Sequence, residues 1–266
     1  MKQQTMRTKG LIALALLLGM FFSVQAADHV RGNGKLTSKR ITIDDFNAIK
    51  INDVIDFNYV QSESTPHIEV TVDENLHPYI NIEIKDRVLT VNFKGAKVDH
   101  YTKFIVKANS RWLKEVRVNG NGNFMLNSQL TGDELKINSS ANSLIQLKEK
   151  VEVGKLDLNV SGSANMVVNE VQTDKLECSI SGSGTINVKQ GTTEEADYNI
   201  TSDGEIMAFG VAASKVDCKI TGKGSAQVQA TEKLKASVVG KGSIRYKGDA
   251  AIDQTILGKG TIEKAN

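Results

Sequence analysis

From residue 116 onward, the chain repeats one pattern of apolar and polar residues. Each repeat has an anchor residue directly before a turn of small residues, and the anchors are spaced 18 to 23 residues apart. They are Val118, Ile137, Val160, Ile180, Ile200, Ile220, Val238 and Ile256. A polar residue stands one position before each anchor, and a mostly apolar residue stands two positions before it. This alternation has the period of a half-buried strand.

A turn of small residues follows each anchor, and a second strand follows the turn. Glycine dominates the turn, as at Gly182 and Gly184, although Ser139 and Ala141 take these places in the second unit. Glycine reaches positive φ and lets stacked corners approach closely. The second strand again alternates, as at Ile186 and Val188. Each unit is therefore predicted to be a strand, a glycine corner, a strand and a return loop.

A unit of this kind buries its apolar face only by stacking on its neighbours. The sequence therefore predicts an all-β fold: a single-chain parallel β-helix, or β-solenoid, over residues 116–266 with rungs of 18–23 residues. We expect it to be right-handed. No helical pattern follows any of the glycines, which excludes a dinucleotide-binding loop.

Residues 27–115 form a less regular β-rich region. Apolar residues alternate over 49–59, 68–72, 80–84 and 89–93, and Pro66 and Pro78 lie between these runs. An open solenoid end would expose unpaired strand edges. Two interpretations stay open: the region supplies the opening rungs, or it is a small cap.

The first 26 residues carry the pattern of a secretory signal peptide. Lys2, Arg7 and Lys9 precede an apolar run over 11–20, and Val24-Gln25-Ala26 forms a small-residue cleavage pattern. Cleavage is expected before Ala27. The alternative is a membrane anchor, but the run is short for a span of about 20 residues. No cysteine follows the cleavage point, so no lipid anchor is expected there. The sequence thus predicts export to the periplasm, the outer-membrane surface or the medium.

Charge and composition restrict the partners. The chain has 33 basic and 31 acidic side chains, and loss of the three basic residues before Ala27 leaves 30 against 31. No basic field is left to attract nucleic acid. No second apolar run reaches the length of a transmembrane segment, so the mature chain is expected to have none. The 22 glycines with only 2 prolines suit many tight turns.

The chain resembles a known family, the adhesin head domains of Bacteroidetes called GIN domains. The resemblance covers about residues 40–264. It rests on Phe46-Asn47-Ala48-Ile49-Lys50-Ile51, on Asp73-Glu74-Asn75-Leu76, and on the turns Ser161-Gly162-Ser163-Ala164 and Ser181-Gly182-Ser183-Gly184. It implies a pectate-lyase-like parallel β-helix and a role in adhesion, without established catalytic residues. No translocator barrel follows Asn266, so a self-exporting autotransporter is not expected.

Residues that could support catalysis or bind metal are sparse. The four histidines, His29, His67, His77 and His100, have no metal-ligand spacing, and no nucleophile elbow is present. An acidic row precedes the anchors at Asp157, Glu177, Asp197, Asp217 and Asp253, with a lysine row beside it at Lys155, Lys175, Lys215 and Lys233. Such rows neutralise each other. We expect no catalytic site, metal or cofactor; the rival interpretation is a polysaccharide-active β-helix enzyme, which would show clustered carboxylates in a cleft.

Two outward rows are candidate binding surfaces. The middle residue of the corner is lysine in the last three units, at Lys223, Lys241 and Lys259. The row is either a ladder that discourages aggregation or a strip that binds an anionic glycan or envelope polymer. Met125, Leu144 and Val167 are apolar at outward positions of the second strand. We expect the 30–115 region to cover them, and a homo-oligomer interface is the alternative.

Cys178 and Cys218 are expected to stay unpaired despite export. They occupy the same position of units two rungs apart. Their Cα atoms would therefore lie about 9–10 Å apart, beyond the reach of a disulfide.

Overall fold

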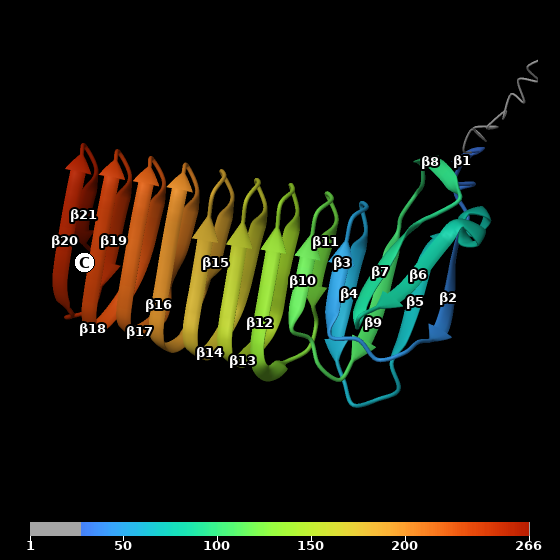
Figure 1. Ribbon diagram of the computed structural model, residues 1–266, viewed down its shortest axis with the longest axis horizontal. Helices are drawn as coiled ribbons and strands as arrows, with labels where there is room; N and C mark the ends of the chain where they lie inside the picture. Colours follow the sequence, from blue (N-terminus) through green and yellow to red (C-terminus); the bar gives the residue numbers. More distant parts are fainter. Residues whose placement is uncertain (1–27, 266) are drawn as a thin grey trace, which may run out of the picture.

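The computed structural model describes residues 28–265 and confirms the predicted fold (Figure 1). Rungs stack side by side along the long axis, and every pairing between solenoid strands is parallel. The predicted signal peptide and its cleavage point lie outside the described residues. The solenoid strands are β10 Glu115–Val118, β11 Asn123–Leu126, β12 Leu130–Ser139, β13 Leu144–Val160, β14 Asn165–Ile180, β15 Thr185–Val188, β16 Gly191–Ser202, β17 Glu205–Gly222, β18 Ser225–Gly240, β19 Ser243–Lys247, β20 Ala251–Gly258 and β21 Thr261–Lys264.

The predicted register is wrong in one rung. Val118 pairs with Ser139, which pairs with Val160, so Ser139 and not Ile137 is the anchor of the second unit. Ser139 is buried, and its hydroxyl lies 2.9 Å from that of Ser143, so a polar anchor is satisfied inside the core. The sequence pattern selects an apolar residue, Ile137, which lies two positions before the true anchor. The corner positions of this rung become Ala141, Asn142 and Ser143.

The return segment is also a strand rather than a loop. β13 and β14 continue through it, and Val151 pairs with Val171, which pairs with Gly191. The segment has its own row of buried side chains, made of Val153, Thr173, Thr193, Ala213 and Ala230. Each central rung therefore presents three strand faces around one core, and all three faces are hydrogen-bonded from rung to rung.

The core contains the two cysteines in one row. Cys178 pairs with Tyr198, and Tyr198 pairs with Cys218, so the tyrosine separates the thiols as predicted. Both cysteines are free and buried. Burial raises the pKa of each thiol well above its ordinary value, which keeps both protonated and unreactive. The Tyr198 hydroxyl is buried and has no hydrogen-bond partner among the described residues.

Replacement of Tyr198 by phenylalanine should stabilise the protein. The change removes an unsatisfied buried hydroxyl, and we expect the free energy of unfolding to rise by about 1 kcal/mol. The matched change is Tyr59→Phe, because the Tyr59 hydroxyl is buried but lies 2.9 Å from the Ser110 hydroxyl. That variant should lose about 1 kcal/mol. Urea unfolding of both variants checks the pair, and a loss at both positions would show that Tyr198 has a partner.

The region before residue 115 contributes both rungs and a cap. Its elements are β1 Asp28–Arg31, β2 Leu36–Thr42, β3 Ala48–Ile51, β4 Asp56–Gln61, β5 His67–Asp73, the 3₁₀ helix η1 Glu74–Tyr79, β6 Ile80–Lys85, β7 Val88–Phe93, β8 Ala96–His100 and β9 Ile105–Ser110. β3 and β4 pair in parallel with β10 and β11, and β7 and β9 stack on their other side. The rung order in space therefore differs from the order along the chain.

Antiparallel pairing ends the stack at this side. β5 pairs with β9 and then with β2, and β6 pairs with β7. β1 and β8 form a separate two-stranded ribbon. We call the part formed by β1, β2, β5, η1, β6 and β8 the cap; it covers rung edges that would otherwise stay unpaired.

The segment Asp73-Glu74-Asn75-Leu76 holds the cap together. The buried Asp73 carboxylate accepts hydrogen bonds from Gly34 N at 2.7 Å, Thr102 N at 2.7 Å and Thr102 Oγ1 at 2.9 Å. Asn75 accepts from Asn33 N and donates to Arg31 O. Leu76 is fully buried. This segment therefore joins the chain around residues 31–34 and 102 to the end of the solenoid.

Candidate ligand-binding surfaces

The corner lysines form a straight exposed row. Gly222, Gly240 and Gly258 pair with one another in successive rungs, so the residues that follow them, Lys223, Lys241 and Lys259, are also in register. All three side chains are exposed. Within residues 28–265 the ion pairs involve other lysines, such as Lys175 and Lys219. None of the three lysines forms an ion pair within the described residues. The exposed Asp203 precedes Lys223 in the same row, because Ser202 pairs with Gly222, so the row is acidic in one rung and cationic in the next three.

The acidic and lysine rows, in contrast, neutralise each other. Lys155 lies 2.8 Å from Glu177, and Lys175 lies 2.9 Å from Glu177 and 3.1 Å from Asp197. Hydrogen bonding from Lys155, assisted by Lys175, holds the pKa of Glu177 below its ordinary value. These carboxylates are occupied by lysines of the chain itself, which matches the interpretation of a charge-balanced sheet face.

The three apolar outward residues do not lie in one row. Met125 pairs with Gln146, which pairs with Val167, while Leu144 is in the adjacent row between Asn123 and Asn165. The prediction that the 30–115 region folds back over them is wrong: among the solenoid strands it pairs with β10 and β11, where it extends the stack at its end. All three side chains are half-buried. An oligomer interface at these positions stays a prediction.

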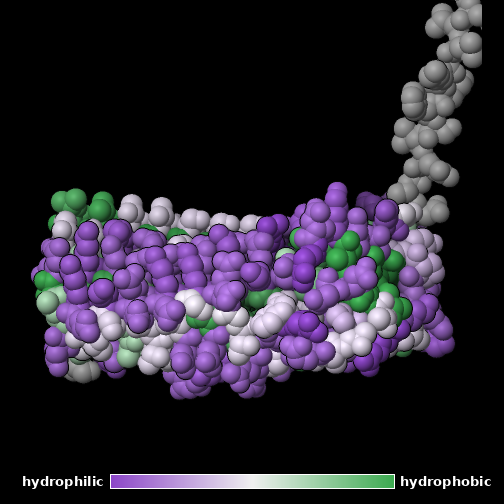
Figure 2. All heavy atoms as spheres, turned by 60° about the horizontal axis from the view of Figure 1, so that its bottom comes forward, coloured by the Kyte–Doolittle hydropathy of each residue, from purple (hydrophilic) through white to green (hydrophobic). Residues whose placement is uncertain are grey.

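The surface of the solenoid is mostly polar (Figure 2). Hydrophilic side chains cover most of the visible face, and apolar colour is concentrated near the last rung and the N-terminal part. Val239 and Leu257, which are 41% and 62% exposed, lie next to the lysine row. No helix within residues 28–265 has the length and apolar character needed to cross a membrane.

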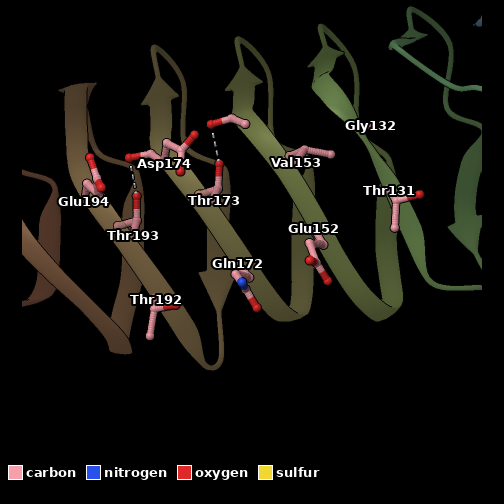
Figure 3. A pocket seen from close by; sticks show the side chains of 11 residues that line it. Thr131, Gly132, Glu152, Val153, Gln172, Thr173, Asp174, Thr192, Thr193 and Glu194 are labelled. Atoms are coloured by element: carbon pink, nitrogen blue, oxygen red, sulfur yellow. Dashed lines mark hydrogen bonds between the residues drawn. The ribbon is translucent and has the colours of Figure 1, made fainter.

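The return face carries a shallow groove of about 570 Å³ (Figure 3). One side is formed by Thr131, Glu152, Gln172 and Thr192, which follow one another on successive rungs. The floor contains Thr173 and Thr193, whose hydroxyls donate to the carbonyls of Gly154 and Asp174 at 2.9 and 3.1 Å. Asp174 and Glu194 line the other side. The groove thus offers carboxylate, hydroxyl and amide groups at a repeat of about 4.8 Å.

A second hollow of about 230 Å³ continues this groove toward the N-terminal side. Both are lined by Thr131 and Gly132, and the second is also lined by Trp112, which is 45% exposed. The sequence prediction missed this surface because it treated the return segment as a loop. The available signals were the single tryptophan and the threonine followed by an acidic residue at 173–174 and 193–194.

The histidines are not gathered at a site. His29 Nδ1 lies 2.8 Å from Asp99 in the β1–β8 ribbon, and His77 Nε2 lies 3.0 Å from the Thr37 hydroxyl. Among residues 28–265, no three histidine, cysteine or acidic side chains are grouped in a way that could hold a metal ion.

These features define a parallel β-solenoid with a capped N-terminal end and long polar faces. The chain belongs to the family described as "Putative auto-transporter adhesin, head GIN domain", whose model matches residues 45–250. A solved structure described as a putative adhesin from Parabacteroides merdae is 74% identical, with a TM-score of 0.89; the match covers 90% of this chain and 100% of that one. A putative adhesin from Parabacteroides distasonis, with the same coverage, is 64% identical with a TM-score of 0.89.

A third solved structure carries a different description. It is described as a putative lipid binding protein from Parabacteroides distasonis and is 36% identical, with a TM-score of 0.84, over 90% of this chain and 100% of that one. No curated protein matches the chain.

Proposed function

We propose that this protein is an exported, non-catalytic binding module of the cell surface that serves adhesion. The adhesin descriptions of its family and of two similar structures support this role. The single observation that carries it is the exposed, in-register lysine row at Lys223, Lys241 and Lys259, which repeats one cationic group per rung. Such a row suits a partner that is itself a repeating polymer.

The proposed partner is an acidic glycan or another anionic envelope polymer. The three ammonium groups start from Cα atoms about 4.8 Å apart, and like charges at this spacing favour binding of a polyanion. The glycines of the corner flank each lysine and leave access to it open. Anionic lipid head groups share this phosphate or carboxylate chemistry, and the exposed Val239 and Leu257 lie beside the row.

A catalytic role is the rival function, and the return-face groove is the observation that favours it. Glu152, Asp174 and Glu194 line one groove on a sheet face, as expected for a polysaccharide-active enzyme. A carboxyl that acts as a general acid near neutral pH is usually kept protonated by burial. Asp174 and Glu194 are exposed, and Glu152 is paired with Lys150 at 2.9 Å. This arrangement supports binding rather than catalysis.

The triple change Lys223→Ser, Lys241→Ser and Lys259→Ser should weaken binding to an acidic polysaccharide at least tenfold at low salt. Wild-type binding should also fall as salt rises. A matched control, Lys39→Ser, Lys85→Ser and Lys94→Ser, removes three exposed lysines dispersed around the cap and should change binding little. Binding is measured by calorimetry in two separate titrations: alginate represents an acidic polysaccharide, and vesicles containing phosphatidylglycerol represent an anionic lipid surface.

Equal loss in both triple variants would show that only net charge matters and would contradict a defined strip. Binding to the vesicles alone would reassign the partner to a lipid surface. Shortened polysaccharide products after incubation would contradict the non-catalytic role.

A further inference from the structure

The return-face groove has a chemistry different from that of the lysine row. Its linings include the carboxylates of Glu152, Asp174 and Glu194, together with the hydroxyls of Thr131 and Thr192 and the amide of Gln172. Asp133 and Glu134 extend the acidic character into the adjoining hollow. Lys150 pairs with Glu152 at 2.9 Å and donates to the Gln172 side-chain oxygen at 2.7 Å, and Lys114 is the cation among the residues that line the two hollows. A polyanion would be repelled here.

Gly132 marks the place where the two hollows meet. It lies inside strand β12 and has no positive φ, and a Cβ added to it would meet nothing within 4 Å. Packing and backbone conformation therefore do not require a glycine at this position. A glycine within a strand weakens the strand and often marks a bulge, a tight bend, or a close approach of a ligand or another backbone. No other backbone lies within 4 Å of a Cβ added to Gly132. Because Gly132 has no side chain, the space between the hollow beside Trp112 and the groove beside Glu152 stays open.

Trp112 supplies a flat apolar surface at one end of the groove. Its side chain is 45% exposed, while its neighbour Leu113 is buried and fixes the segment to the core. An exposed aromatic ring beside a row of hydrogen-bonding groups fits the two kinds of surface on a sugar. The C–H face of a pyranose stacks on the ring, and its hydroxyls donate to carboxylates and accept from threonine and glutamine.

We propose that the continuous groove from Trp112 to Glu194 is a binding site for an uncharged oligosaccharide chain. The groups repeat once per rung, at about 4.8 Å, which is similar to the length of one pyranose unit in an extended glycan. The site differs in position and in ligand charge from the lysine row, so it goes beyond the proposed function and can fail independently of it.

The single tryptophan of the chain makes the test direct. The mature protein is titrated with neutral hexasaccharides of the gluco, manno, xylo and galacto series while Trp112 fluorescence is recorded. We expect at least one series to shift the emission to shorter wavelength in a saturable manner. Calorimetry with that series then compares variants: Trp112→Ala and Gly132→Gln should each lose at least tenfold in affinity.

Gly132→Gln is the sharper variant because its Cβ would meet nothing within 4 Å, so the longer side chain extends into open space and the thermal midpoint should remain close to that of the wild type. The triple change at Lys223, Lys241 and Lys259 should leave hexasaccharide binding unchanged. The inference is overturned if no series shifts the emission, if Gly132→Gln and Trp112→Ala bind like the wild type, or if spermine binds the groove in preference to every sugar.

Discussion

Replacing Asp73 with asparagine should lower the free energy of unfolding of the cap by about 3 kcal/mol. The carboxylate accepts from two backbone N–H groups and one hydroxyl, and hydrogen bonds to a charged group are worth about 1.5–3 kcal/mol each. An amide at this position presents one acceptor oxygen and an NH₂ group that faces donors. At least one of the donors of Gly34 and Thr102 then loses its partner inside the protein.

Hydrogen exchange at the Gly34 and Thr102 amides measures this effect locally, and urea unfolding measures it for the whole chain. The control is Asp249→Asn, whose side chain is 97% exposed and pairs with Lys264; it should change stability by less than about 0.5 kcal/mol. Unchanged protection of the Gly34 and Thr102 amides in Asp73→Asn would contradict the role of this carboxylate.

The same carboxylate should make the cap sensitive to acid. Burial alone would raise the pKa of Asp73, but the hydrogen bonds from Thr102 and Gly34 outweigh it and hold the pKa below its ordinary value. A carboxyl with a lowered folded-state pKa adds stability above its unfolded pKa of about 3.9. That stability is lost as the pH falls through the folded-state pKa. Asp73→Asn should therefore show a flatter dependence of cap stability on pH below about 4.

Replacing Gly222 with alanine should destabilise the solenoid by about 3 kcal/mol. Gly222 has φ +129°, and an added Cβ would lie 2.5 Å from the Ser202 carbonyl oxygen of the preceding rung. Both the backbone strain and the contact with a fixed backbone atom oppose the change. Gly132→Ala is the matched control, since its added methyl group meets open space, and it should cost less than about 0.5 kcal/mol.

Ser202 provides the reverse experiment in the same row. It pairs with Gly222 and holds φ 113° with a side chain present. Ser202→Gly should therefore relieve strain and raise the free energy of unfolding by about 1 kcal/mol. Thermal and urea unfolding of the three variants measures these changes. A loss of stability in Gly222→Ala as small as that in Gly132→Ala would contradict the claim that the corner requires glycine at residue 222.

The repeat made the solenoid predictable because each rung obeys the same rule of alternation. Five consecutive rungs with apolar anchors, from Val160 to Val238, pair as expected. The rule assumes an apolar anchor in every rung, and it fails at Ser139, which is polar. The Ser139 hydroxyl is hydrogen-bonded to that of Ser143, a partner that a sequence pattern does not show. The rung order of the N-terminal region was also beyond prediction, since β3 and β4 lie between strands that come later in the chain.

Of the two candidate surfaces, the lysine row could be predicted from the sequence and the return-face groove could not. The lysine row follows from spacing alone, because parallel stacking turns a repeat in sequence into a line in space. The return-face groove depends on a segment whose buried row contains Thr173 and Thr193, which look polar in sequence but donate inward to carbonyl groups. Trp112 lies in the connection between β9 and β10, and no local sequence pattern predicts that this connection borders the groove.

The most direct test of the central proposal is a glycan array probed with residues 27–266 of the chain, with each bound glycan analysed by mass spectrometry after release. Binding by two separate faces predicts two groups of retained, intact glycans: acidic ones lost in the triple lysine variant, and uncharged ones lost in Gly132→Gln. Retention of no glycan, or release of bound glycans as shortened fragments, would contradict the proposal that this solenoid is a non-catalytic binding module.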